Sequence, residues 1–129
     1  MKKNLVCWFQ IPVNDMARAV KFYETIFSVK IKVENFGEEL IGWFPASEDK
    51  TAPNAGGQLI FNPKYYKPNP NGTLIYFASQ TNNLNDELSR IEAAGGKVIV
   101  EKMQITEKIG FMGAFIDSEG NRMALHSTN

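Results

Sequence analysis

The feature that most restricts the fold is an internal repeat, in which the second half of the chain follows the pattern of the first. With a shift of 68 positions, Trp8-Phe9 falls on Tyr76-Phe77. With a shift of 71 positions, Ile41-Gly42-Trp43-Phe44 falls on Met112-Gly113-Ala114-Phe115. Two blocks that match in the same order indicate a duplicated unit, and the slip of three positions between them fits a loop insertion.

Each unit is predicted to contain one strand, one helix and three further strands. The first helix is marked by apolar residues at the spacing of one helical face, namely Met16, Ala19, Val20, Tyr23, Ile26 and Phe27. The second is marked by Leu84, Leu88 and Ile91, and it ends at Gly95-Gly96 because glycine tolerates the left-handed position after a helix. Strands are expected at residues 5–13, 30–34, 40–44, 58–61, 73–79, 98–102, 111–116 and 122–126.

These elements predict one α+β domain over residues 1–129, built from two βαβββ modules. Module one covers about residues 4–62, and module two covers about residues 73–129. Residues 63–72 join them and contain three prolines, which disfavour regular structure. Half of the chain would bury too little core to be stable alone, so we expect the modules to form a single domain.

Composition narrows the class of partner. Lysine and arginine total 14, and aspartate and glutamate also total 14, so the formal net charge is zero. The chain therefore lacks the positive charge expected of a protein that binds nucleic acid or an anionic membrane. No apolar run suggests a signal peptide or a membrane span. Cys7 is the only cysteine, so an internal disulfide cannot form, and alternation along the strand predicts that its side chain is buried beneath the first helix. We expect a cytoplasmic protein.

Two segments resemble a known family. Residues 8–23 resemble the opening strand and the V-x-D-x-x-R-A-x-x-F-Y helix pattern of vicinal-oxygen-chelate proteins, and residues 117–127 are similar to their closing D-P-E/D-G-N hairpin. The resemblance extends to residues 92–98 and is greatest to small bacterial proteins related to lactoylglutathione lyase. It implies the glyoxalase/bleomycin-resistance fold, in which two βαβββ modules curl around a shared cavity and the helices cover the outside.

The resemblance also implies where a metal would bind. Members of this family often hold Zn, Ni, Fe or Mn with His, Glu or Gln residues, one from the first and one from the last strand of each module. Trp8 lies seven residues before Asp15 of the helix pattern, and Ala124 lies four residues after Gly120 of the hairpin. Tyr76 is the counterpart of Trp8 in the second module. Strand alternation favours Gln58 as the counterpart of Ala124, because the other register would bury an unpaired amide under the helix. The four ligand positions are then occupied by Trp8, Gln58, Tyr76 and Ala124.

This set predicts a cavity that binds no metal. Tryptophan offers only an N–H donor and alanine offers no ligand atom, so the donors that such metals need are missing. Lactoylglutathione lyase chemistry needs a metal to polarise the substrate carbonyl, which argues against that activity. We predict instead metal-independent binding of a small apolar or aromatic molecule. The expected ligand-binding residues are Trp8, Gln10, Trp43, Gln58, Tyr76 and Ala124. The alternative is that Trp8 and Tyr76 fill a closed core.

His126 is the basis of an alternative, enzymatic interpretation. It is the only histidine, and it lies two residues beyond Ala124 on the same strand face. It could serve as the base of a lyase or isomerase, or as a metal ligand in an extradiol-dioxygenase-type enzyme. A structural histidine hydrogen-bonded near the strand end is the simpler explanation. A third hypothesis is a homodimeric interaction module, since relatives often pair across module edges.

The remaining charged residues have structural interpretations. Asp15 and Arg18 are expected to supply a helix cap and a surface ion pair. Asp117 and Glu119 are expected to shape a turn. Residues 101–110 mix charges with apolar side chains, and we interpret them as either a lid over the cavity or a solvated loop.

Overall fold

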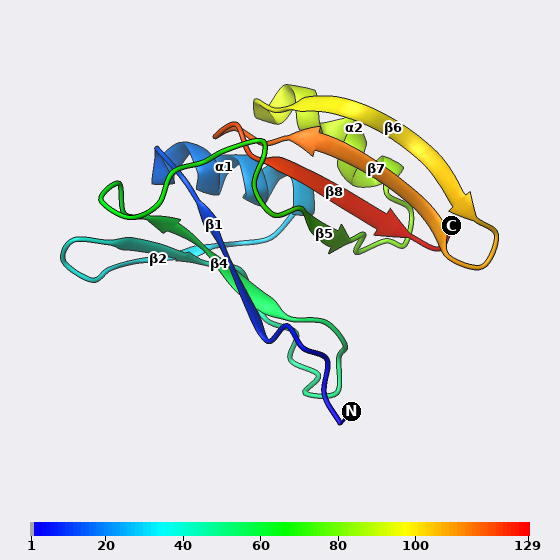
Figure 1. Cartoon of the computed structure of the whole chain (residues 1–129), viewed down its shortest axis with the longest axis horizontal. Coiled ribbons are helices and arrows are strands. Elements are labelled where there is room, and N and C mark those ends of the chain that lie inside the picture. The colour runs from blue at the N-terminus through cyan, green and yellow to red at the C-terminus, as the bar shows by residue number, and fades with distance from the viewer. Residues whose placement is uncertain (1) are drawn as a thin grey trace.

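The computed structural model describes residues 2–129 and has an α+β architecture of two βαβββ modules (Figure 1). The first module contains β1 (Trp8–Pro12), α1 (Met16–Phe27), β2 (Lys32–Asn35), β3 (Leu40–Trp43) and β4 (Gly56–Phe61). The second contains β5 (Ile75–Ala78), α2 (Asn85–Ala94), β6 (Lys97–Thr106), β7 (Gly110–Ile116) and β8 (Arg122–Ser127). The predicted order of elements is confirmed in both halves.

Each module forms its own four-stranded sheet with the same topology. The strand orders are β1-β4-β3-β2 and β5-β8-β7-β6. In each sheet the first and last strands of the module pair in parallel, and the other neighbours are antiparallel. Gln10 pairs with Gln58 in the first sheet, and Tyr76 pairs with Ala124 in the second. If Gln58 is the counterpart of Ala124, these pairs make Gln10 the structural counterpart of Tyr76, whereas the sequence repeat matched Tyr76 with Trp8, which pairs with Gly56.

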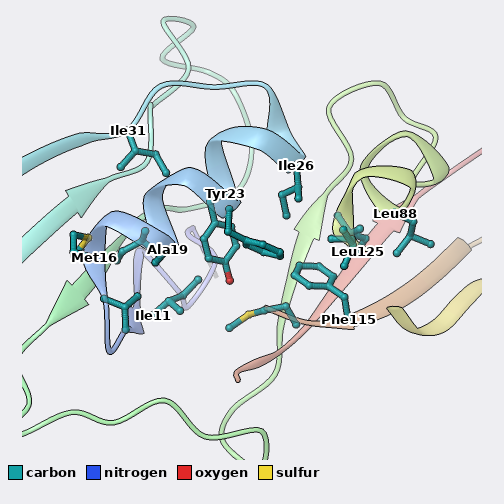
Figure 2. Packing of buried hydrophobic residues seen from close by; sticks show 14 of the residues in the cluster. Ile11, Met16, Ala19, Tyr23, Ile26, Ile31, Leu88, Phe115 and Leu125 are labelled. Atoms are coloured by element: carbon teal, nitrogen blue, oxygen red, sulfur yellow. The ribbon is translucent and has the colours of Figure 1, made fainter. Parts of the chain in front are cut away.

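One hydrophobic core joins the modules. Phe22 of α1 packs against Phe115 of β7 with ring centroids 6.0 Å apart, and Phe9 of β1 meets Phe77 of β5 at 5.9 Å. Figure 2 shows Tyr23 of α1 within the same cluster as Phe115. Large aromatic side chains bury much apolar area each, so this shared cluster stabilises both modules together.

The sheets themselves stay apart. Among residues 2–129, no strand backbone of one sheet comes within 8 Å of a strand of the other, measured between Cα atoms. The modules meet through the core side chains and through the contact between α1 and α2, where the Arg90 guanidinium donates to the Ile26 carbonyl at 2.7 Å. Within the same residues, neither helix is long and apolar enough to cross a membrane.

Residues 101–110 are neither a loop nor a lid, and that prediction was wrong. They form the end of β6, a tight turn and the first residue of β7, with Met103 paired to Met112 and Thr106 to Gly110. The register shifts three times along this pair of strands. Such irregularities break the strict alternation by which a strand is recognised in a sequence, which is why the hairpin was missed.

Cys7 is exposed, so the prediction of a buried thiol was also wrong. The regular strand begins only at Trp8, one residue later. The alternation that carries Phe9 and Ile11 toward the core therefore does not extend back to Cys7.

Candidate functional site

Three predicted site residues form one cluster on the first sheet. The Trp8 indole Nε1–H donates to Gln58 Oε1 at 2.9 Å. The Trp8 and Trp43 rings meet edge to face, with centroids 5.9 Å apart and planes inclined by 61°. Trp43 also pairs with Gln58 across β3 and β4. Strand neighbours such as Phe9 and Leu59 belong to the core under α1, so this cluster occupies the opposite, helix-free face.

A glycine makes the close approach of Trp8 possible. Gly56 is the residue paired with Trp8 in β4, and a Cβ atom there would lie 3.1 Å from the indole ring. Without that side chain the ring can settle over β4 and reach the amide of Gln58. Gln58 is only 5% exposed, whereas the Trp8 side chain keeps 43% of its surface in solvent. The cluster thus combines a buried amide, that of Gln58, with a half-exposed aromatic ring, that of Trp8.

Trp43 carries an unused hydrogen-bond donor. Its Nε1 atom is buried and has no partner among the residues that the structure describes. An unpaired buried donor of this kind costs about 1–3 kcal/mol. The Gln58 oxygen accepts from Trp8 and makes no hydrogen bond with the Trp43 indole. The cluster therefore holds a donor with no acceptor.

The second sheet presents a different surface. Tyr76 lies beside Ala124 and is 50% exposed, whereas Ala124 is fully buried. Ala114 flanks Ala124 on the other side and is also buried, so larger neighbouring side chains cover the small residues at the centre of this sheet. Met103 on β6 is 53% exposed. This face is apolar and open.

His126 lies on that same face, paired with Ala78 and Met112. Its Nε2 is 2.7 Å from the carbonyl oxygen of Ile109 in the β6–β7 turn. A carbonyl only accepts, so Nε2 carries the proton and donates, and only Nδ1 remains to act as a base. This geometry matches the structural interpretation of His126. A catalytic role for it stays a prediction.

The predicted site residues thus fall into two groups. Trp8, Trp43 and Gln58 are in contact, and Gln10 is exposed beside Gln58. The second-sheet group comprises Tyr76, Ala124 and His126. Because the two sheets do not approach each other, a closed cavity lined by all of these residues stays a prediction. The structure has hollows instead beside α1, one of them lined by Met16, Ala17, Val20, Lys21, Glu24, Val33 and Leu40.

The residues predicted for the metal positions lack the donors that a divalent metal prefers. Trp8 offers only an N–H, which donates to Gln58, and Ala124 has no donor atom. Among residues 2–129, no group of three His, Cys, Asp or Glu side chains is placed to hold a metal. No step of the chemistry is therefore assigned to a metal at these positions.

Sequence analysis missed a network of buried polar groups that joins the modules. Glu119, in the turn before β8, accepts from Arg18 Nε at 2.7 Å and from Arg18 Nη2 at 3.0 Å. It also accepts from the backbone N–H groups of Asn14 and Asp15 at 2.9 and 2.8 Å. Asp15 itself caps α1 by accepting from the Arg18 backbone N–H at 3.0 Å. The predicted cap is confirmed, but the prediction of a surface ion pair was wrong: Arg18 pairs with a fully buried carboxylate of the second module.

Asp117 extends this network into the core. It accepts from the Tyr23 hydroxyl at 2.6 Å and from the backbone N–H groups of Glu119 and Asn121 at 2.8 and 2.9 Å. The Asn121 amide in turn donates to the Pro12 carbonyl at 2.9 Å. The predicted turn is present, and its side chains also form hydrogen bonds with Tyr23 and Pro12 of the first module. No signal within one module could have revealed contacts to residues about 100 positions away.

The two carboxylates of the network have opposite pKa shifts. Burial raises the pKa of Asp117 above its ordinary value, and its hydrogen bonds from Tyr23 and Asn121 only partly oppose that effect. Burial would also raise the pKa of Glu119. For Glu119, however, the hydrogen bonds from Arg18, Asp15 and Ser118 outweigh the effect of burial, so its pKa is lowered. A lowered carboxyl pKa stabilises the folded protein above the unfolded pKa, and that contribution is lost as the pH falls through the folded pKa.

We therefore expect the Glu119→Gln variant to be less stable than the wild type at neutral pH, with a difference that shrinks in acid. The difference should be constant above about pH 5.5 and decline below 4.5, the ordinary Glu pKa. Asp117 is present in both proteins, so its opposing effect cancels. Urea unfolding of both proteins from pH 7 to pH 3 measures this difference, and a gap that widens in acid would contradict the assignment.

The two βαβββ modules define the class of fold to which this protein belongs. A model of the Glyoxalase/Bleomycin resistance protein/Dioxygenase superfamily matches residues 6–125, and the chain belongs to that superfamily. No curated protein matches the sequence significantly.

Solved structures agree on the fold. Glyoxalase I from Zea mays is 19% identical with a TM-score of 0.69, and the alignment covers 95% of this chain but 45% of the maize protein. The chain thus spans about half the length of that relative. A glyoxalase/bleomycin resistance protein from Albidiferax ferrireducens is 17% identical, with a TM-score of 0.67 and coverage of 95% and 98%. The fosfomycin resistance protein FosX from Listeria monocytogenes is 17% identical, with a TM-score of 0.65 and coverage of 100% and 94%.

Proposed function

We propose that this protein binds a small, flat apolar or aromatic molecule, without a metal, against the cluster of Trp8, Trp43 and Gln58. The observation that carries the proposal is the half-exposed indole of Trp8, held in place by its hydrogen bond to a buried amide. A rigid aromatic wall loses little conformational entropy when a flat ligand stacks on it. The matched family includes bleomycin resistance proteins by name, so small-molecule binding agrees with its description.

A neutral fluorescent naphthalene tests this proposal. N-phenyl-1-naphthylamine should bind saturably to the wild type with enhanced emission, and Trp8→Ala should weaken binding at least about tenfold because the stacking surface is lost. Tyr65→Ala is the matched control, since Tyr65 is an aromatic residue of the linker that is 67% exposed and lies outside the cluster. Equal loss in both variants, or no saturable binding by the wild type, would refute the proposal.

We further propose that the protein is a homodimer whose second copy covers the open sheet faces. The chain exposes 8360 Å². A compact monomer of its mass, 14.5 kDa, would expose only about 6,900 Å². The exposed surface includes large apolar side chains on the helix-free faces, namely Trp8, Tyr76 and Met103. A standard interface buries about 800 Å² on each partner, so an excess of about 1,460 Å² on one chain is enough to supply one side of a larger, obligate-type interface.

Sedimentation velocity measures whether the protein is a monomer or a dimer in solution. We expect a species of twice the 14.5 kDa chain mass at micromolar concentration. Met103→Glu, on the open face of the second sheet, should shift the protein toward monomer because it would bury an unpaired charge. Ala17→Glu, on the exposed side of α1, should not. A wild type that stays monomeric at high concentration would refute the dimer. A cytoplasmic location is part of this proposal, and a chain whose only cysteine is Cys7 agrees with a reducing compartment.

A further inference from the structure

The helix of the first module leaves one edge of its sheet uncovered. Measured between Cα atoms and within the part of the chain that the structure describes, α1 comes within 8 Å of β3 and β4 but not of β2. β2 is the outer strand of that sheet (Figure 1). In the second module α2 does approach β6, the strand that corresponds to β2. The modules share one topology, so the uncovered edge belongs to the first module and is not a general property of the fold.

A hollow of about 430 Å³ lies in this gap, between α1 and the pair of strands β2 and β3. Its walls are mostly apolar and include Val20 of α1, Val33 of β2 and Leu40 of β3. Val33 pairs with Gly42, over which Met16 of α1 packs, yet 45% of the Val33 surface stays exposed. The volume lies within the range of small-molecule pockets. Apolar surface is therefore open to solvent where the helix does not reach the sheet edge.

This hollow continues along α1 into a second one with more polar walls. The second hollow, of about 380 Å³, shares Lys21 and Glu24 with the first and is also lined by Thr25, Ser28, Val29 and Lys30. Helix positions three and four apart lie on the same face, so residues 17, 20, 21, 24 and 28 form one stripe along α1. We call the two hollows together the α1 groove. It is apolar near the start of the helix and polar near its end.

Two lysines give the polar end of the α1 groove a positive charge. Neither Lys21 nor Lys30 forms an ion pair with any of residues 2–129. Among the described residues that line the groove, Glu24 is the one acid, and its Oε2 accepts from the Ile31 backbone N–H at 2.8 Å. The groove thus combines an apolar wall with two cations that have no carboxylate partner, which is the complement of an anionic amphiphile.

We propose that the α1 groove binds a medium-chain carboxylate, whose alkyl chain lies against Val20, Val33 and Leu40 and whose carboxylate pairs with Lys21. The order of apolar and cationic walls along α1 sets the orientation of the ligand. A groove open on one side suits an unbranched chain, which needs apolar surface on its other side alone. This site lies on the face of the first sheet opposite to the cluster of Trp8, Trp43 and Gln58, and is independent of the function proposed there.

Probes that differ in chain length and in charge test the two halves of the groove. Calorimetry on the full chain, below the concentrations at which the probes form micelles, should show saturable binding of decanoate. Decanoate should bind about 16-fold more tightly than hexanoate, because each of its four additional CH₂ groups contributes about twofold in an open groove, against about fourfold for full burial. Decanol should bind more weakly than decanoate, since it brings no charge to Lys21. Equal affinities of decanoate and decanol would overturn the carboxylate assignment, and no saturable binding of decanoate would overturn the site.

Substitutions separate the charged end of the groove from its apolar end. Lys21→Glu should weaken decanoate about tenfold and leave decanol nearly unchanged, because only the carboxylate meets the reversed charge. Lys50→Glu is the matched control, since Lys50 is exposed and lines neither hollow. Val33→Asn should weaken both probes. Equal losses for decanoate in the Lys21 and Lys50 variants would mean that net charge and not the groove governs binding, which would contradict the proposal.

Intermolecular NOEs locate the ligand in the wild-type protein without relying on any variant. The decanoate chain should show NOEs to the methyl groups of Val20, Val33 and Leu40. Trp8→Ala should leave decanoate binding unchanged, and Lys21→Glu should leave the binding of N-phenyl-1-naphthylamine unchanged. NOEs to other methyl groups alone, or loss of decanoate binding in Trp8→Ala, would overturn the α1 groove as the site. Failure of N-phenyl-1-naphthylamine alone to bind would instead overturn the function proposed for the aromatic cluster.

Discussion

Replacing Glu119 with alanine is expected to lower the free energy of unfolding by about 2–4 kcal/mol. The side chain is fully buried, and its loss leaves the backbone N–H groups of Asn14 and Asp15 without their acceptor. It also removes both hydrogen bonds from Arg18, whose half-exposed side chain returns to solvent at little cost. Most of the expected loss therefore comes from the two uncapped donors at the start of α1. Urea unfolding at pH 7 measures it.

The matched control for this variant is Glu34→Ala. Glu34 also pairs with a cation, Lys32, but both side chains are well exposed and no buried donor depends on them. Surface pairs of this kind contribute about 0–1 kcal/mol, so the control should be nearly neutral. If Glu119→Ala were equally mild, the second module would not be anchored to α1 in the way that the hydrogen bonds indicate.

Replacing Gly110 with alanine is the second change with a large expected effect, about 3 kcal/mol or more. Gly110 begins β7 with a φ of 103°, where an L-residue is strained. A Cβ atom there would also lie 2.4 Å from the Ser127 carbonyl oxygen, which is backbone and cannot swing aside. The turn would have to move and would draw the Ile109 carbonyl away from His126.

The Gly37→Ala variant separates the cost of the positive φ from the cost of the steric clash. Gly37 has a similar φ of 82°, but a Cβ atom there would meet nothing within 4 Å. It should therefore show the conformational cost alone, about 1–2 kcal/mol. Thermal or urea unfolding of both variants makes the comparison. Equal losses would mean that the contact between Gly110 and Ser127 is looser than the structure shows.

Much of the fold was predictable from local pattern. The apolar spacing from Met16 to Phe27 predicted α1, and the repeat predicted the same order of elements in both modules. The choice of Gln58 as the cavity-facing residue of β4 depended on strand alternation, and the structure places Gln58 beside Trp8 and Trp43 on the helix-free face. These features are fixed by periods of 3.6 and 2 residues, which any single stretch of sequence carries within itself.

Local pattern failed where irregular backbone interrupts it. The bulged pairing of β6 with β7 hid a hairpin that the composition of residues 101–110 made look like a loop. The late start of β1 exposed Cys7 where uninterrupted alternation would have buried it. In the first case shifts of register along the strands interrupt the alternation, and in the second the regular strand begins too late to include the residue.

The sequence by itself determined that this chain forms two βαβββ modules, one in each half. Only the tertiary structure decided how the modules meet: Glu119 and Asp117 reach back across about 100 residues to α1, and the two sheets remain apart. It also revealed the unpaired donor of Trp43. Burial and hydrogen-bond partners depend on which distant segments pack together, and no spacing within a single module encodes that information.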